Sequence, residues 1–250
     1  MNRIIVNSVN ETQKIFQRKK TVVFLIITVL VPAGTAALFV FGQNALGIFA
    51  VNSASFPISM LGLFSSLLLP LFIFSMAADL FSGELGDKTL KLTLTRPVTR
   101  FKVFLSKNIA IAFFVVVSLA LLFVVSVIAG FFLNGGALSL TDLFQTLLAY
   151  IMAVVPMLVL GIIGVFLAQF FRNSGAALIT SVFVYLAGKA TPFLFPTLAK
   201  VSPFSYTDWY MMWTGSAVSA GRLINTFLIM LSHSLILFAL GFSLFDKKDI

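Results

Sequence analysis

The chain alternates between long apolar runs and short polar connections. An α-helix needs about 20 apolar residues to cross the hydrocarbon core of a bilayer. Six runs meet this requirement, at approximately residues 21–41, 57–78, 109–133, 146–170, 175–195 and 223–245. We therefore predict an all-α membrane protein with six transmembrane helices, organised as a single transmembrane domain over residues 1–250.

Residues 1–20 precede the first apolar run and have a different pattern. Apolar and small side chains recur at helical spacing, whereas polar and charged side chains occupy the other positions around the helix. This arrangement predicts an amphipathic helix that lies on the inner membrane surface. The apolar stripe consists of Ile4, Ile5, Val9, Thr12, Ile15 and Phe16. A basic tail without fixed structure is the alternative.

A polar segment at residues 79–107 separates the second and third apolar runs. It holds six Lys or Arg and three Asp or Glu residues, so it must lie in water or against another protein. Glu84 precedes Lys88 by four residues, the favourable order for an ion pair within a helix. The Arg96–Pro97 step then favours a helix break. We predict a short cytoplasmic helix here, and a solvated loop without a partner is the alternative.

Composition and charge placement support a membrane protein. Hydrophobic residues make up 60% of the chain, charged residues make up 10%, and the mean hydropathy is +1.08. Of the 17 Lys and Arg residues, 14 lie on the side of residues 1–20, 79–107 and the C-terminus. Because cytoplasmic loops carry the excess of basic residues, both termini are expected in the cytoplasm and the chain in the plasma membrane. The net charge of +9 is thereby explained without nucleic acid.

Aromatic residues gather in the predicted outer segment at residues 196–222. Tyr206, Trp209 and Trp213 lie close together in the sequence, which favours short helices that dip into the outer leaflet. These residues form either an interfacial aromatic belt or part of a substrate path or outer gate. His233 is the only histidine and lies in the sixth apolar run. It serves either as a proton relay or as a hydrogen-bonding partner of a neighbouring helix.

The residues offer little chemistry for an enzyme. Cysteine is absent, and neither an H-E-x-x-H nor a G-x-S-x-G motif occurs. Residues 83–89, Gly-Glu-Leu-Gly-Asp-Lys-Thr, superficially match the end of a phosphate-binding loop, but Asp87 interrupts the required Gly-Lys-Thr step. We therefore expect no catalytic, cofactor or metal site on this chain.

Several stretches of the sequence resemble a known family. Glu84, residues 86–90, 94–100 and 105–107 are similar to the E-x-x-x-G-T-L-x-x-L-L-x-x-P-x-S-R-x-x-x-x-x-x-K signature of ABC-2 type permeases, which joins the second and third of six spans. The ending at residues 245–250 resembles the family's F-x-x-[KR]-D-[IL] ending. Asp87 and Lys88 depart from the signature, because Gly is often followed directly by Thr in the family.

The resemblance implies a permease subunit of an ATP-driven transporter, usually an exporter, that pairs as a homodimer or heterodimer. A separate ATPase subunit would bind ATP and Mg²⁺ and would seat the polar segment as a coupling helix. The residues to which the resemblance assigns this coupling are Glu84, Asp87, Lys88, Thr89, Leu90, Arg96, Pro97 and Arg100. A secondary transporter or channel, or a non-transporting membrane immunity protein, remains the alternative.

Overall fold

The computed structural model describes residues 3–46, 54–87, 89, 99–133, 139–214 and 218–248. This part of the chain is helical and contains no β-strand. The elements are α1 (Arg3–Gln17), α2 (Lys19–Leu46), α3 (Phe56–Leu63), η1 (Phe64–Leu68), α4 (Leu69–Ala77), η2 (Ala78–Gly83), α5 (Glu84–Gly86), α7 (Arg100–Phe131), α8 (Leu140–Ala168), α9 (Ser174–Leu194), α10 (Pro196–Ala199), η4 (Pro203–Tyr206), α11 (Met211–Thr214) and α12 (Ala220–Asp246).

Among the described residues, six helices are long and apolar enough to cross a membrane. They confirm the predicted fold class. The second of these helices runs from Phe56 to Gly86 and includes two π-helical stretches, η1 and η2. π-Helical turns within α-helices are rare and are frequent at functional sites.

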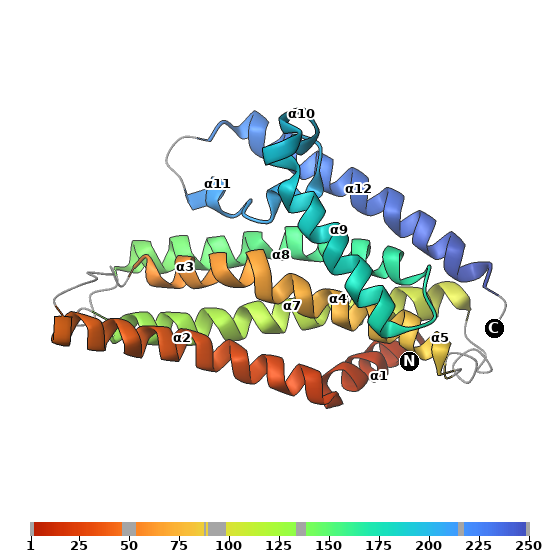
Figure 1. Ribbon diagram of the computed structural model, residues 1–250, viewed down its shortest axis with the longest axis horizontal. Helices are drawn as coiled ribbons and strands as arrows, with labels where there is room; N and C mark the ends of the chain where they lie inside the picture. Colours follow the sequence, from red (N-terminus) through yellow and green to blue (C-terminus); the bar gives the residue numbers. More distant parts are fainter. Residues whose placement is uncertain are drawn as a thin grey trace.

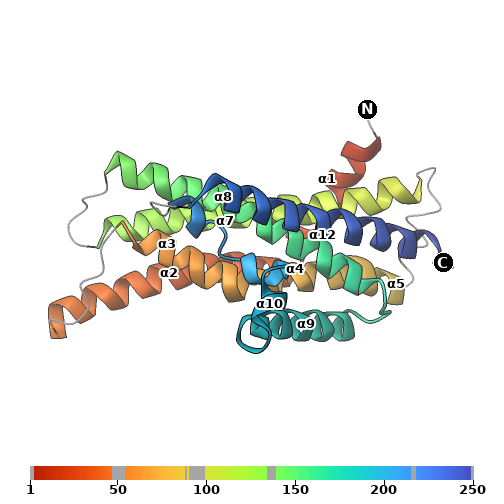
Figure 2. The ribbon, with the colours of Figure 1, turned by 90° about the horizontal axis from the view of Figure 1, so that it is seen from above.

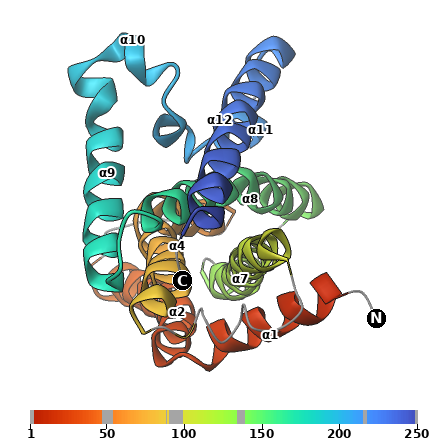
Figure 3. The ribbon, with the colours of Figure 1, turned by 90° about the vertical axis from the view of Figure 1, so that its right-hand side faces the viewer.

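The long helices run along the longest axis of the molecule, and α1 crosses one end of the bundle (Figure 1, Figure 2). Seen along that axis, α9 and α12 diverge from the group formed by α2, α4, α7 and α8 (Figure 3). Both chain termini lie at the end of the bundle that also carries α1 and α5 (Figure 1). This end therefore brings together the two sequence ends and the start of the polar segment.

The third long helix begins earlier than the apolar pattern predicts. Helix α7 starts at Arg100, whereas the predicted span starts at residue 109. The backbone of Thr99 is extended, with φ −67° and ψ 146°, and the helix then continues without interruption to Phe131. The apolar pattern marks only the part of the helix that crosses the hydrocarbon core. Backbone hydrogen bonding within the helix continues beyond that part, so α7 starts earlier. The last residues of the expected loop at 79–107 are thus helical.

The outer aromatic segment packs back on the bundle. Both η4 and α11 contact α8, and η4 also contacts α9 and α12. Gly188 of α9 lies so close to the ring of Phe204 that an added Cβ atom would overlap it. The short helices therefore lie beside the long ones (Figure 1). The prediction that these helices dip into the outer leaflet stays a prediction.

Candidate functional site

Helix α1 turns a face with both polar and apolar side chains toward the protein. Ser8, Glu11 and Ile15 are buried, whereas Ile5 and Val9 are 57% and 50% exposed. In a membrane protein an exposed apolar face contacts lipid, so Ile5 and Val9 suit the position of α1 across the end of the bundle (Figure 3). The carboxylate of Glu11 consequently points toward α7 instead of water.

Lys107 of α7 lies at the centre of a buried charge cluster. Its side chain is 0% exposed, and its Nζ atom lies 2.8 Å from Glu11 Oε2 and 2.7 Å from Glu84 Oε2. Lys14 Nζ lies 2.7 Å from Glu11 Oε1 and 3.3 Å from Glu84 Oε1. We call Glu11, Lys14, Glu84 and Lys107 the charge cluster. Two cations face two carboxylates, so every buried charge has an opposite partner, as burial of ions requires.

A second group of charges surrounds Asp79. The carboxylate lies 2.9 Å from Arg18 Nη1 and 3.2 Å from Lys20 Nζ. Arg18 and Lys20 lie at the corner between α1 and α2, where the buried Thr21 hydroxyl donates a 2.6 Å hydrogen bond to the carbonyl of Ile15. The corner is therefore held by the hydrogen bond between Thr21 and Ile15 and by the ion pairs with Asp79 of the second long helix.

The second long helix ends in a short stretch at residues 78–86, which we call the stem. Its Ser82 hydroxyl donates a 2.8 Å hydrogen bond to the carbonyl of Ala168 at the end of α8. A Cβ atom on Gly86 would overlap the carbonyl oxygen of Arg172 in the turn between α8 and α9. Together with Asp79 and Glu84, these contacts attach the stem to α1, α7 and the α8–α9 turn.

Electrostatics in the charge cluster favour the ionised forms of the two residues of α1. Burial by itself would raise the pKa of Glu11, but the positive charge and hydrogen bonds of Lys107, helped by Lys14, lower it below 4.5. Burial likewise works against the charge of Lys14, yet the hydrogen bond to Glu11 and the charge of Glu84 raise its pKa above 10.5. Both shifts contribute stability only while the two groups are charged.

This linkage predicts how attachment of α1 depends on pH. The contribution of Glu11 is present above about pH 4.5 and is lost as pH falls through its lowered pKa, whereas that of Lys14 is lost only as pH rises past its raised pKa. We expect the protection factors of the α1 amides, which compare each exchange rate with that of an unfolded chain at the same pH, to be high at neutral pH and to fall below about pH 4.5. Glu11→Gln should make the acid response shallower. An unchanged acid response in this variant would contradict the prediction.

The structure shows different environments for the predicted coupling residues. Glu84 is buried in the charge cluster, so its carboxylate faces the protein's own helices. Asp87 is exposed, and Thr89 Oγ1 donates a 3.3 Å hydrogen bond to the carbonyl of Glu84. Four of the predicted residues lie outside the described part of the chain, together with the expected Glu84–Lys88 pair. They are Lys88, Leu90, Arg96 and Pro97.

Arg100 connects the start of α7 with the C-terminal end. Its Nη1 atom donates hydrogen bonds to the carbonyls of Asp246 and, at 3.0 Å, Lys248. Burial, followed by the nearby charge of Arg172, lowers the pKa of Lys248 to about 8. The guanidinium of Arg100 is thus hydrogen-bonded to backbone carbonyls at the C-terminal end of α12. A positive charge at this end of a helix is favourable, because the helix dipole is negative there.

The predicted outer-gate residues lie at the opposite part of the molecule. Trp209 is buried, packs edge-on against Trp213 at 5.4 Å and stacks with Phe227 of α12. The Tyr206 hydroxyl donates to the carbonyl of Lys200. His233 Nδ1 lies 2.8 Å from the carbonyl of Ile229 in its own helix. Trp209 and Trp213 are thus neighbours in space, whereas the hydrogen bond of His233 lies within α12.

Sequence reasoning missed Glu11, Lys14, Asp79 and Lys107 as members of a site. Apart from the Glu11–Lys14 pair, the ion-pair partners lie far apart in the chain. Amphipathic spacing alone could not show that Glu11 faces protein. One signal was available, because Lys107 lies close before a long apolar run. A lysine in such a place needs either the membrane surface or a buried carboxylate.

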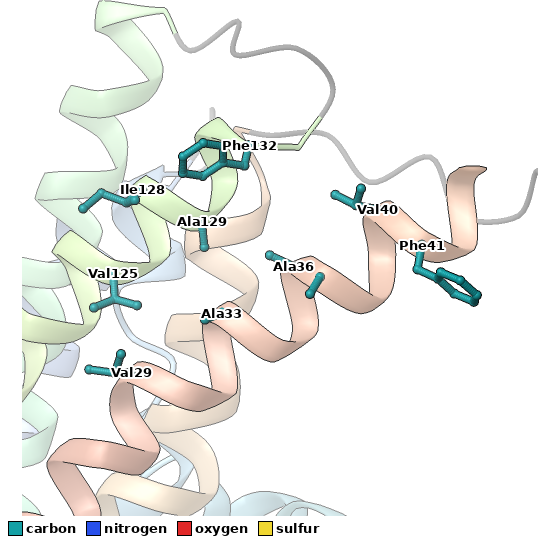
Figure 4. Close-up of a pocket in the computed structure, with 10 residues that line it drawn as sticks. Val29, Ala33, Ala36, Val40, Phe41, Val125, Ile128, Ala129 and Phe132 are labelled. Atoms are coloured by element: carbon teal, nitrogen blue, oxygen red, sulfur yellow. The ribbon is translucent and has the colours of Figure 1, made fainter. Parts of the chain in front are cut away.

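An apolar groove of about 710 Å³ lies between α2 and α7, away from the charge cluster. Ala33, Ala36 and Val40 of α2 face Val125 and Ala129 of α7 across it (Figure 4). Its walls carry no charged side chain, so it offers no group for acid, base or metal chemistry. The described residues also contain no cluster of three or more His, Cys, Asp or Glu residues that could hold a metal ion.

The fold and the site define a multi-pass helical membrane protein whose terminal end is held together by ion pairs. The family described as ABC-2 family transporter protein matches residues 9–188. The chain therefore belongs to the ABC-2 transporter family, and the resemblance found in its sequence is confirmed. Family membership makes it a membrane permease and supports a non-catalytic role within an ABC transporter. Among curated proteins, none matches the chain.

Proposed function

We propose that this permease is the membrane-spanning subunit of an ATP-driven exporter and that it works with a separate ATPase subunit, which binds ATP and Mg²⁺. Two permeases, identical or different, would pair in the plasma membrane with their termini in the cytoplasm. The ATPase would dock on residues 87–99, which include the exposed Asp87 and follow the stem.

The observation that carries this proposal is the attachment of the stem on three sides. Glu84 binds Lys107 of α7 and Lys14 of α1, Asp79 binds Arg18, and Ser82 binds the end of α8. A displacement of the docking residues is therefore delivered to three helices at once. A loop held only by its two chain connections would transmit such a movement poorly.

We assign two roles to the predicted coupling residues. Asp87 is exposed and is suited to touch the ATPase directly, together with Lys88, Leu90, Arg96 and Pro97 of the same segment. Glu84 and Arg100 are engaged within the chain, so they would act by positioning the docking residues. Glu84→Ala and Arg100→Ala are expected to weaken transport through this indirect route.

Site-specific cross-linking to the ATPase tests the proposal. Since the chain has no cysteine, Asp87→Cys creates a unique attachment point at the docking segment. We expect it to cross-link to an ABC ATPase subunit that co-purifies with the permease, whereas Lys200→Cys in the aromatic segment should not. Transport in vesicles should require ATP and that ATPase. Cargo movement by the permease alone, or no Asp87→Cys product in a transporting complex, would contradict the proposal.

A further inference from the structure

A groove with one charged end lies between α2, α4 and α9. Its volume is about 550 Å³. Val23 of α2, Phe72 of α4 and Val182 of α9 contribute to its apolar walls, whereas Lys19 and Lys20 lie at its end beside the α1–α2 corner. The groove therefore combines a hydrocarbon-lined surface with two ammonium groups at the terminal end of the bundle.

The charges at this end are not balanced by the protein. Lys20 is 57% exposed and shares the carboxylate of Asp79 with Arg18, which lies closer to it at 2.9 Å. Lys19 is exposed and has no ion-pair partner among the described residues. Among the described residues, two of the three cations at this corner share one carboxylate and the third has none. An ammonium group has three donors, so Lys20 can keep its contact with Asp79 and still bind an anion.

We propose that this groove binds an anionic phospholipid from the leaflet on the side of the chain termini. The phosphate would lie between Lys19 and Lys20, and an acyl chain would lie along Val23, Phe72 and Val182. Basic pockets between membrane helices are suited to anionic headgroups. The proposal concerns the chain itself and does not rest on an ATPase partner.

Charge is what distinguishes this groove from the one between α2 and α7. The latter has a larger volume, about 710 Å³, but no charged side chain in its lining. Acyl chains of any lipid can fill such a surface, with nothing to select a headgroup. At Lys19 and Lys20 selection follows from the excess positive charge, which favours an anionic over a zwitterionic lipid.

Lipid binding to the purified full chain in detergent tests whether the groove prefers an anionic headgroup. Phosphatidylglycerol and phosphatidylcholine with the same acyl chains are titrated, and bound lipid is counted by native mass spectrometry. We expect preferential binding of phosphatidylglycerol. Lys19→Gln/Lys20→Gln should lower this affinity about 30-fold, the effect of losing two lysines near an anionic lipid. Lys102→Gln/Lys247→Gln is the matched control, because it removes two charges at the same end of the bundle but outside the groove.

A second pair of variants tests the acyl-chain position. Val182→Phe narrows the groove without changing charge and should reduce phosphatidylglycerol binding, whereas Ile179→Phe on an exposed part of α9 should not. Equal losses in the two double lysine variants would overturn the proposal. So would binding of inorganic phosphate alone, in the same native mass spectrometry experiment, with the affinity found for phosphatidylglycerol. Dimerisation that excludes phosphatidylglycerol from the groove would assign this surface to a second copy of the chain and would also overturn it.

Discussion

Replacing Lys107 by Met is expected to destabilise the protein by roughly 3–5 kcal/mol, the cost of breaking a buried ion pair by removing one partner. The variant leaves the carboxylates of Glu11 and Glu84 inside the protein, with only the half-exposed Lys14 to balance them. Thermal unfolding in detergent would measure the loss. Lys102→Met is the control on the same helix, because Lys102 has no ion-pair partner among the described residues.

A triple variant separates the stability of the charge cluster from its function. Glu11→Gln/Glu84→Gln/Lys107→Met removes the buried charges together, and such replacements are often nearly neutral for stability. We expect this variant to fold but to transport more slowly with its ATPase, since the ion pairs that connect α1, α7 and the stem are gone. If Lys107→Met is as stable as Lys102→Met, the cluster does not stabilise the fold.

The number and approximate position of the long helices could be predicted from the sequence, because hydrocarbon imposes a length of about 20 apolar residues on each. The ends of these helices were harder to predict. Helix α7 begins at Arg100, since hydrogen bonding within a helix can continue after the apolar run stops. The π-helical stretches η1 and η2 had no signal that apolar periodicity could reveal.

The candidate site could be predicted only in part. The motif at residues 84–107 predicted a coupling segment, and it included both Glu84 and Lys107. It did not reveal that these two residues bind each other and Glu11, because Glu11 is 96 residues from Lys107. Periodicity shows that a helix has two faces, but only its packing partner decides which face is buried. For Glu11 that partner is α7.

Gly86 is expected to be a second point of high sensitivity, for a steric reason. A Cβ atom at this position would overlap the carbonyl oxygen of Arg172, and a backbone atom cannot move aside as a flexible side chain can. Gly86→Ala should therefore separate the stem from the α8–α9 turn and destabilise the protein by about 1–3 kcal/mol, the usual cost of overpacking. Transport should fall as well, because the stem loses its close contact with the α8–α9 turn.

Gly83→Ala is the matched control three residues earlier in the same stem. Its Cβ atom would lie 3.6 Å from Ser174 Cβ, an ordinary van der Waals contact. Since alanine restricts the unfolded chain more than glycine does, this substitution should stabilise the protein by about 0.5–1 kcal/mol. Thermal unfolding of the two variants should thus give shifts of opposite sign. Stabilisation by both substitutions would show that contact with Arg172 does not restrict position 86. The attachment of the stem would then rest on Ser82 and the ion pairs alone.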